Sequence, residues 1–265
     1  MICHTVHIPY KFGQTIRIKG ICDVHLGNTN ADIRAFKKWL YENDEDRFVS
    51  FGDLMDSIIT KDMKRYRKSS DATEGDDIID ESLENLYDLL NPIAKSGRLL
   101  NIGSGNHEDE IIKRCGTNPS KRLAKMLNVP FLGLTFLMDI ILSEGKSRSR
   151  TIKNHFHHGW GAGARTAGAA LTKYARSMAA WDAQIYWRGH DHQRDTKAFC
   201  RNGIRGTKIV AADQLLGLGG TWLKTYSSTT DPTYAETRGY DPVKLGGISL
   251  LVKPTSSFCD MKFEA

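Results

Sequence analysis

Five short polar segments of the sequence carry aspartate, asparagine or histidine, in most cases beside glycine. In chain order they are Asp23-Val24-His25, residues 52–56 (GDLMD), residues 105–108 (GNHE), His157-His158-Gly159 and residues 189–192 (GHDH). Carboxylates and neutral imidazoles are ligands for Zn, Mn, Fe or Ni, and such a site requires no thiolate. One carboxylate can bridge two cations, and two cations ~3.5–4 Å apart form a clamp for phosphoryl groups. These residue types therefore predict a site for divalent metal ions.

Each of these segments follows an apolar stretch that we predict to be a strand. The stretches are residues 16–22, 47–51, 99–103, 151–157 and 184–188. In open α/β sheets, ligands bind just outside the carboxyl ends of the strands. Along an extended segment, residues two apart point to the same side, which applies to Asp23 and His25 and to His190 and His192. Each segment alone is also typical of a strand-end turn or a helix cap, so the prediction depends on the ordered set.

The remaining pattern predicts an α/β protein with a substantial sheet. Helices are expected over residues 32–42, 77–94 and 164–180, and another helix begins at Asn118-Pro119, where asparagine is the cap and proline the first residue. Further strands are expected over residues 131–142, 196–200, 208–212 and 247–252. Residues 61–77, 217–220 and 227–239 are predicted to be loops. His4 and His7 are expected to lie near a frayed terminus without a role.

Composition places the chain among ordinary globular proteins. Its 265 residues are 40% hydrophobic and 26% charged, with a net charge of +6, which excludes disordered, collagen-like and coiled-coil classes. The positive charge fits an anionic substrate. The five cysteines form no CxxC pair and their number is odd, so we expect a reducing compartment. No stretch approaches the ~20 apolar residues of a membrane span, and the first residues lack the apolar core of a signal peptide. A soluble, cytoplasmic protein without membrane contact is predicted.

The order of the motifs resembles that of the calcineurin-like metallophosphoesterase superfamily, in particular its nuclease-like and phosphodiesterase-like branch. The resemblance covers residues 16–192 and leaves residues 193–265 as additional strands and loops. It implies a four-layer α/β/β/α sandwich of two mixed β-sheets, formed by a single domain over residues 1–265. It also implies a phosphoesterase, that is, a hydrolase acting on phosphoric ester bonds.

The resemblance implies two divalent metal ions, with Mn²⁺ expected first and Zn, Fe, Ni or Mg as alternatives. The first ion would be held by Asp23, His25, Asp53 and His192. The second would be held by Asp53, Asn106, His158 and His190. Asp53 would bridge the two ions, and a hydroxide between them would attack phosphorus in line. His107 would serve as general acid or charge stabiliser, oriented by Asp56.

The ligand in the fourth motif has an alternative. Strand alternation places Phe156 on the same side as His158, and His155 and His157 on the other. The histidine directly before glycine is the ligand in the superfamily, which favours His158 and leaves His157 as the alternative. A structural zinc site is disfavoured, because such sites commonly include cysteine ligands in a closed set.

The second motif bears on the substrate. In the phosphoprotein phosphatases of the superfamily it continues into Arg-Gly, whose arginine clamps a monoester, whereas here Ser57 follows Asp56. Gly-Asp-Leu-x-Asp looks more like the DNA-repair nucleases and the lipid A pathway pyrophosphatases. The latter typically carry arginine where this chain has His107, which favours the nuclease-like branch. A phosphodiesterase is therefore predicted, with a phosphomonoesterase or a catalytically silent binding protein as alternatives.

Three further features concern substrate and partners. The basic run at residues 61–68 (KDMKRYRK) is either a solvated loop or a contact for a nucleic-acid backbone. The glycine-rich residues 161–168 could aim backbone N–H groups at a phosphate, with Arg165 assisting, and Arg188 is a second candidate clamp. Trp160 could line the pocket. The expected partner is a phosphate-ester substrate, including a nucleotide or nucleic acid; the oligomeric state is not predicted.

Overall fold

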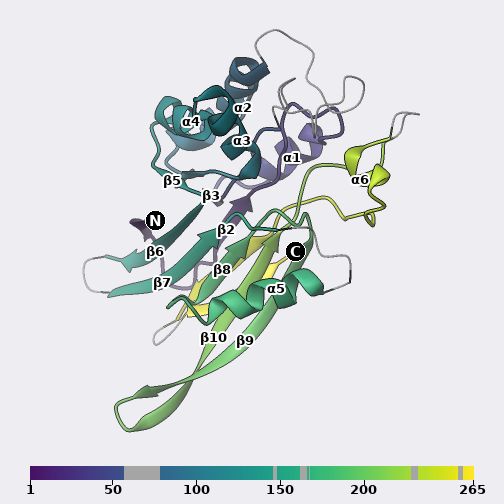
Figure 1. The fold of residues 1–265 in the computed structure, drawn as a ribbon. Helices are drawn as coiled ribbons and strands as arrows, with labels where there is room; N and C mark the ends of the chain where they lie inside the picture. The colour runs from purple at the N-terminus through teal and green to yellow at the C-terminus, as the bar shows by residue number, and fades with distance from the viewer. Residues whose placement is uncertain (57–77, 146–147, 162–165, 167, 228–231, 256–258) are drawn as a thin grey trace.

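Two mixed β-sheets form the middle of the molecule (Figure 1). The computed structural model describes residues 1–56, 78–145, 148–161, 166, 168–227, 232–255 and 259–265. The larger sheet has the order β1 (Ile2–Pro9), β6 (Thr135–Glu144), β7 (Arg148–His157), β8 (Ile185–Arg188), β10 (Lys208–Gly219) and β9 (Arg194–Arg205). The smaller sheet has the order β12 (Cys259–Glu264), β11 (Ser249–Pro254), β2 (Ile16–Ile21) and β3 (Arg47–Ser50). Parallel and antiparallel pairs occur in both.

Helices cover the outer faces of both sheets. The described helices are α1 (Ile33–Leu40), α2 (Ile78–Lys95), α3 (Asn106–Cys115), α4 (Pro119–Leu127), α5 (Ala169–Met178) and the short α6 (Tyr234–Thr237). Strands β4 (Ile102–Gly103) and β5 (Phe131–Gly133) form a separate parallel pair. In Figure 1, α1 to α4 gather beside β2 and β3, whereas α5 lies along β8 and β10.

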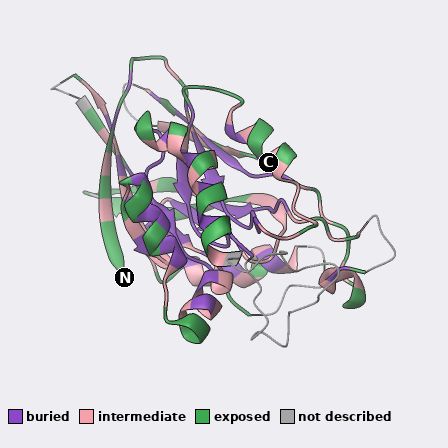
Figure 2. Ribbon diagram, turned by 90° about the horizontal axis from the view of Figure 1, so that it is seen from above, coloured by how far each residue is buried: buried purple, intermediate pink, exposed green. Residues whose placement is uncertain are grey.

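Three hydrophobic clusters fill the interfaces between the layers. The first lies between the sheets and joins residues such as Phe136 and Trp187 to Ile18 and Leu250. The second lies between the smaller sheet and α1 to α4, and the third between α5 and the outer face of β8 and β10. Figure 2 shows the buried residues concentrated on the central strands, with the exposed residues on the outside of the helices. The expected four-layer α/β/β/α sandwich is thus confirmed.

Local signals in the sequence determine several of the helix ends. The carboxylate of Asp32 accepts a hydrogen bond from the backbone N–H of Ala35 at the start of α1. Asn118 caps α4 in the same way through the N–H of Lys121. Such caps satisfy backbone donors that have no partner inside the helix. The expected helices over residues 32–42 and 77–94 and the helix start at residues 118–119 agree with the structure to within two residues.

Several expected elements differ from the observed ones. Residues 2–9, expected to be frayed, form β1, whose partner is β6. Its alternating burial leaves polar side chains such as His7 exposed, and an edge strand tolerates this. Residues 217–219 belong to β10 and are not a loop; a Cβ at Gly217 would crowd Ile248 and Phe263, so the glycine permits close packing of the two sheets. The expected strand at 131–142 is interrupted after Gly133, where φ is 83°.

Further differences concern element length. Residues 106–115 form α3, so Asn106 and His107, expected in a short polar segment after a strand, are the first residues of a helix. The strands expected over residues 196–200 and 208–212 are the two long arms of the β9–β10 hairpin, which extends beyond β8 (Figure 1). The strand expected over residues 99–103 is reduced to two residues. The helix expected over residues 164–180 is described as Ala169–Met178, and residues 162–165 and 167 lie outside the described part, as do residues 57–77. Within the loop expected over residues 227–239, residues 234–237 form α6.

Residues 193–265 contribute to both sheets. Strand β10 lies between β8 and β9, and β11 pairs with β2, the strand that leads to the first motif. All five cysteines are free. Among the described residues, no helix combines the length and the apolar character needed to cross a membrane.

Candidate metal centre

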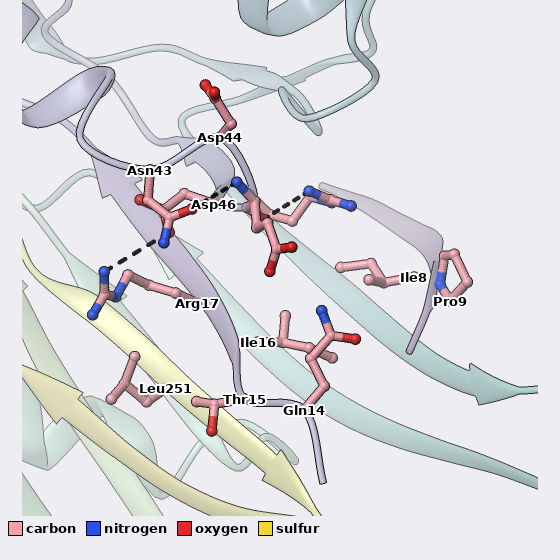
Figure 3. A pocket seen from close by; sticks show the side chains of 12 residues that line it. Ile8, Pro9, Gln14, Thr15, Ile16, Arg17, Asn43, Asp44, Asp46 and Leu251 are labelled. Carbon is pink, nitrogen blue, oxygen red and sulfur yellow. Dashed lines mark hydrogen bonds and ion pairs between the residues drawn. The ribbon is translucent and has the colours of Figure 1, made fainter. Parts of the chain in front are cut away.

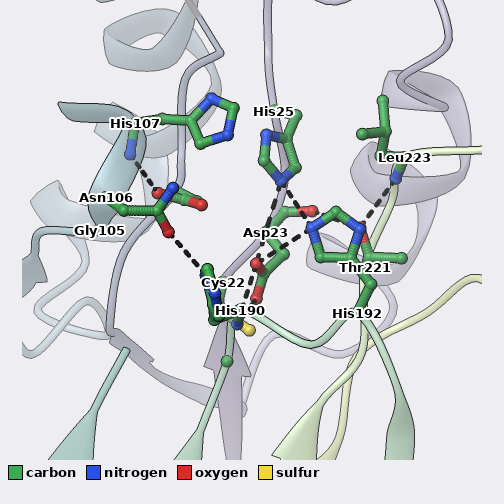
Figure 4. A network of polar contacts seen from close by, with 12 residues as sticks. Cys22, Asp23, His25, Gly105, Asn106, His107, His190, His192, Thr221 and Leu223 are labelled. Atoms are coloured by element: carbon green, nitrogen blue, oxygen red, sulfur yellow. Dashed lines mark hydrogen bonds and ion pairs between the residues drawn. The ribbon is translucent and has the colours of Figure 1, made fainter. Parts of the chain in front are cut away.

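The five motifs meet at one end of the two sheets. Asp23 and His25 follow β2, Asp53 and Asp56 follow β3, and His158 follows β7. Asn106 and His107 begin α3, and His190 and His192 follow β8. Figure 4 shows the side chains from three of these segments pointing toward one another. Three groups of potential ligand atoms result among the described residues: Asp23, His25 and His192 form the first cluster, Asp53, His158 and His190 form the second, and His25 also groups with Asp56 and His107.

In the first cluster the ligand atoms of three residues lie within 4.8 Å of one another. Nε2 of His25 is 3.0 Å from Nε2 of His192. Nε2 of His192 is 3.4 Å from Oδ1 of Asp23, and Nε2 of His25 is 3.9 Å from the same oxygen. Asp23 and His25 are buried, whereas His192 is partly exposed. Two imidazole nitrogens and a carboxylate oxygen that converge in this way are a donor set suited to a divalent cation.

The second cluster also includes Asn106. Nε2 of His158 is 3.1 Å from Oδ2 of Asp53 and 3.0 Å from Oδ1 of Asn106. The same asparagine oxygen lies 2.7 Å from Nδ1 of His190. Nδ1 of His158 faces the carbonyl oxygen of Phe51 at 3.2 Å. A partner at one ring nitrogen fixes which nitrogen is presented to a metal, so His158 presents Nε2 to the cluster.

Asp53 belongs to the second cluster by these distances, and among the described residues it is not grouped with the first. Its Oδ1 accepts a hydrogen bond from the backbone N–H of His107. Burial would raise the pKa of Asp53, but the charges of His158 and His107 lower it well below its usual range. Burial alone would lower the pKa of His158, but the Asp53 carboxylate raises it to about 9. Buried carboxylates in this centre thus attract positive charge.

The backbone of the candidate ligands is strained. The described non-glycine residues with positive φ are Asp23 (49°), His25 (52°), Asp53 (50°), His190 (72°), His192 (58°) and Asn128 (55°). Asn128 ends helix α4, and the other five are candidate metal ligands. L-residues in this region cost about 1–3 kcal/mol each and persist only where the surroundings impose the conformation. Strain confined in this way to converging donor atoms is typical of a functional site, and the donor set fits two cations.

Asp56 contacts two histidines at once. Its Oδ1 is 2.6 Å from Nδ1 of His107 and 3.0 Å from Nδ1 of His25. Its Oδ2 accepts a hydrogen bond from Nδ2 of Asn28 at 2.8 Å. Burial would raise the pKa of Asp56, but His107 and His25 lower it. Asp56 therefore contacts His107, and its role in orienting that histidine stays a prediction. The structure adds contacts to His25 and Asn28 that the sequence reasoning missed, since no motif marks Asn28.

Glu108 joins two motifs through backbone contacts. Its buried carboxylate accepts hydrogen bonds from Gly105 N (2.7 Å), Asp53 N (3.1 Å), Leu54 N (2.7 Å) and Met55 N (3.3 Å). A Cβ at Gly105 would overlap Oδ1 of Asp53, so only glycine allows this approach. Sequence reasoning gave Glu108 no role, although an acidic residue directly after Asn-His was a usable signal.

Asp191 links the centre to α5. It stands between His190 and His192, and its Oδ2 is 2.6 Å from Nζ of Lys173, a residue of α5. Asp191 is nearly fully buried and Lys173 about three-quarters buried, so solvent screens this ion pair less than a surface pair. Nζ of Lys173 also donates to the carbonyl oxygen of Trp160. The loop with the last two candidate ligands is thereby fixed to a helix.

His157 lies outside both clusters. Its Nδ1 accepts a hydrogen bond from the N–H of Gly159, and its ring contacts Trp160 edge to face. Burial and the charge of Arg188 lower the pKa of His157 to about 4. His158 occupies the position in the second cluster instead, so the geometry favours it over His157 as ligand.

Of the remaining residues that the sequence suggested as substrate contacts, those that the structure describes lie outside both clusters. Trp160 is 39% exposed and contacts His157 and Tyr174. Arg188 is buried, and its Nη1 donates to the carbonyl oxygens of His155 and Trp187, so the guanidinium is held inside the protein. Arg165 and the basic run at residues 61–68 lie outside the described residues. A cavity of about 310 Å³ beside Thr15, Ile16 and Arg17 (Figure 3) is at the start of β2, the end opposite Asp23.

Comparisons with protein-family models and with curated proteins found no match. Among solved structures, the calcineurin-like phosphoesterase YfkN from Bacillus subtilis is 12% identical with a TM-score of 0.40, and the match covers 95% of this chain and 90% of that chain. A Vps29 variant from Entamoeba histolytica is 14% identical with a TM-score of 0.40, covering 94% and 100%. A metallophosphoesterase from Sphaerobacter thermophilus is 14% identical with a TM-score of 0.37, covering 94% and 87%. At such TM-scores the likeness carries no weight beside the geometry of the site. The solved structures that resemble this chain thus include calcineurin-like phosphoesterases, the superfamily that the order of its motifs resembles.

Proposed function

We propose that the chain is a metal-dependent phosphoesterase, a single domain over residues 1–265 that holds two divalent cations. The observation that carries the proposal is the convergence, at one end of the sheets, of two clusters of buried and partly buried carboxylate, amide and imidazole ligands, five of which lie on strained backbone. Asp23, His25 and His192 would hold one cation, and Asn106, His158 and His190 the other, with Asp53 between them. Oxygen and nitrogen donors without thiolate fit Mn²⁺, Zn²⁺, Fe²⁺ or Ni²⁺, and the resemblance to the superfamily makes Mn²⁺ the first candidate.

Cations bound there would polarise the phosphoryl oxygens and lower the pKa of a water molecule that attacks phosphorus in line. The protein's own groups would orient the substrate and move a proton. Asp56 holds Nδ1 of His107, so Nε2 is the nitrogen that would give a proton to the leaving-group oxygen. His107 is 15% exposed, which allows a substrate to reach it. Asn28 would keep Asp56 in place through its second oxygen.

We further propose that diesters are preferred over monoesters. A monoester carries an additional charge, and a clamping arginine would favour it, but Ser57 follows Asp56 where the protein phosphatases have that arginine. Arg188 is engaged with backbone carbonyls. The net charge of +6 favours a polyanionic substrate such as nucleic acid, whose phosphates are contacted by Lys and Arg.

The test is hydrolysis by metal-stripped protein before and after addition of Mn²⁺. The substrates are bis(nitrophenyl) phosphate, nitrophenyl phosphate, a cyclic nucleotide, and single- and double-stranded DNA. We expect no turnover after chelation, recovery with Mn²⁺ and a higher kcat/KM for the diester. Turnover by metal-free protein would reject the metal-dependent reaction. A clear preference for the monoester with intact DNA would reject only the substrate class.

The bridging role of Asp53 is tested by comparing Asp53→Asn with Asp23→Asn. A residue shared by two cations compensates both charges, so its neutralisation should lower the metal content per chain further than loss of a ligand to one cation. Elemental analysis after dialysis against Mn²⁺ measures this content. Equal metal content and activity in the two variants would mean that Asp53 serves one cation only.

A further inference from the structure

Residues 220–223, which follow β10, lie against the first cluster (Figure 4). The hydroxyl of the buried Thr221 donates to the carbonyl oxygen of Asp23 at 2.9 Å, and the backbone N–H of Trp222 donates to the same oxygen at 3.0 Å. Oγ1 of Thr221 also accepts a hydrogen bond from the N–H of Leu223. Because Oγ1 accepts from Leu223, its own proton points to the carbonyl oxygen of Asp23. The two hydrogen bonds together fix the orientation of the hydroxyl.

Residues 220–223 are also held by backbone hydrogen bonds to two other parts of the chain. The N–H of Gly220 donates to the carbonyl oxygen of Gln193, the residue directly after His192, at 3.0 Å. The N–H of Gly246 donates to the carbonyl oxygen of Thr221 at 2.9 Å. Residues 220–223 therefore contact both chain segments that carry ligands of the first cluster, and they are anchored to the segment that leads into β11.

Asp23 needs such support because its φ is 49°, a conformation that persists only where the surroundings impose it. A carbonyl oxygen has two lone pairs, and the donors from Thr221 and Trp222 engage both. We propose that Thr221 is a positioning residue that holds the Asp23 backbone in its ligating conformation. It thereby raises the affinity of the first cluster, and not the second, for a divalent cation. This inference rests on the proposed metal site.

The test is titration of metal-free protein with Mn²⁺ by calorimetry. Thr221→Val keeps the shape of the side chain and removes the hydroxyl. We expect one of two binding steps to weaken by about 10- to 100-fold, as for other residues that orient metal ligands, while the other step is unchanged. Thr221→Ser restores the hydroxyl and should recover most of the lost affinity. In an Asp23→Asn background, Thr221→Val should add no further loss, because the ligand that it positions is already impaired.

Thr233→Val is the matched control. Thr233 is also buried, donates its hydroxyl to a backbone carbonyl, that of Thr225, and caps α6 away from both clusters. It should lower the melting temperature and leave both binding steps intact. The proposal is overturned if Thr221→Val weakens both steps equally or neither, or if Thr221→Ser binds no better than Thr221→Val.

Folding of the variants is checked by circular dichroism, and Thr221→Ala replaces Thr221→Val if the latter does not fold. Failure of both to fold, with Thr233→Val folded, would assign Thr221 a purely structural role and overturn the proposal. Wild-type protein that binds no Mn²⁺ would reject the proposed metal site itself, an outcome distinct from these.

Discussion

His107 combines a buried anchor with an accessible ring. Its Nδ1 lies 2.6 Å from Asp56, and its backbone N–H donates to the Asp53 carboxylate. Under the proposed function, His107→Ala should therefore reduce turnover while the metal content per chain stays unchanged. A general acid contributes about 10²–10⁴-fold, and this loss should be smaller for nitrophenolate, which leaves without a proton, than for an alkoxide.

The measurement is kcat for a series of diesters with leaving groups of increasing pKa, together with metal content by elemental analysis. Asp56→Asn is the companion variant: it should show the same dependence on the leaving group through His107, together with a lower metal content, because Asp56 also contacts His25. If His107→Ala lost the same factor for every leaving group, the histidine would orient the substrate without donating a proton.

His155 is predicted to make stability depend on pH. Its ring stacks on Trp181, and its Nδ1 faces Nη2 of Arg188 at 3.0 Å. Burial, followed by the charge of Arg188, lowers the pKa of His155 to about 3, whereas an unfolded histidine titrates near 6.5. As pH falls from about 6.5 toward 3, the unfolded chain binds a proton that the folded protein does not. The stabilisation present above pH 6.5 is therefore lost progressively in this range, by at most about 1.4 kcal/mol per pH unit.

The check compares wild type with His155→Gln, whose amide oxygen can still accept a hydrogen bond from Arg188. Unfolding free energies from urea titrations at pH 7, 6 and 5 give the difference between the two proteins. We expect the unfolding free energy of the variant to rise relative to that of wild type as the pH falls. The other titrating groups are common to both proteins and cancel in the comparison. A difference that stays constant with pH would contradict the predicted pKa.

At the scale of elements, helix α3 is flanked by two glycines, Gly105 at its start and Gly116 at its end, which are required for different structural reasons. Gly105 precedes the helix, and a Cβ there would overlap the Asp53 carboxylate. Gly116 ends the helix with φ of 69°, and no atom lies within 4 Å of an added Cβ. Gly105→Ala should therefore displace Asp53 and reduce metal content. Gly116→Ala should retain the metal but lower the free energy of unfolding by roughly 1–2 kcal/mol, the cost of a left-handed L-residue.

Elemental analysis and urea unfolding of the two variants separate these effects. Full metal content in Gly105→Ala would show that Asp53 tolerates the added methyl group, and the close packing of the two motifs would then not be required for binding.

Elements that depend on local chemistry were predictable, and those that depend on distant partners were not. Asp32 and Asn118 mark helix starts because each caps a backbone N–H three residues away. Strand β1, in contrast, is held by β6, more than 120 residues later, and its polar alternation resembles a loop. In the sequence, Gly217 is typical of a turn. Only the folded structure shows that this residue of β10 must be small because Ile248 and Phe263 pack against it.

The same division applies to the candidate site in the whole molecule. The ligand types could be read from the motifs, since each motif ends a predicted strand and carries its own donors. The contacts of Asn28 and Thr221 could not, because each joins segments that only the folded chain brings together. The side chains that could hold metal are thus encoded locally, whereas the groups that orient them are distributed over the sequence.

Metal binding should stabilise the whole protein, because both clusters combine residues from separate parts of the chain and exist only in the folded state. A ligand at 100 times its Kd adds about 2.7 kcal/mol per site, and each kcal/mol raises the Tm of a protein of this size by about 2–4 °C. Mn²⁺ should therefore raise the Tm of stripped protein by several degrees, measured by scanning calorimetry. Asp53→Asn should show a smaller rise, and an unchanged wild-type Tm would contradict folded-state binding.

The hydrogen bond between Thr221 and Asp23 joins residues 198 positions apart, and this has a consequence for biosynthesis. A nascent chain that has emerged from the ribosome as far as His192 already contains every candidate ligand. Residues 220–223 and the β11 partner of β2 are still missing at that stage, so the first cluster is not yet supported. Long-range pairings of this kind also slow folding. Under the proposed function, we therefore expect a chain that ends before residue 220 to hydrolyse little substrate, and full activity to require residues 220–223 and the pairing of β11 with β2.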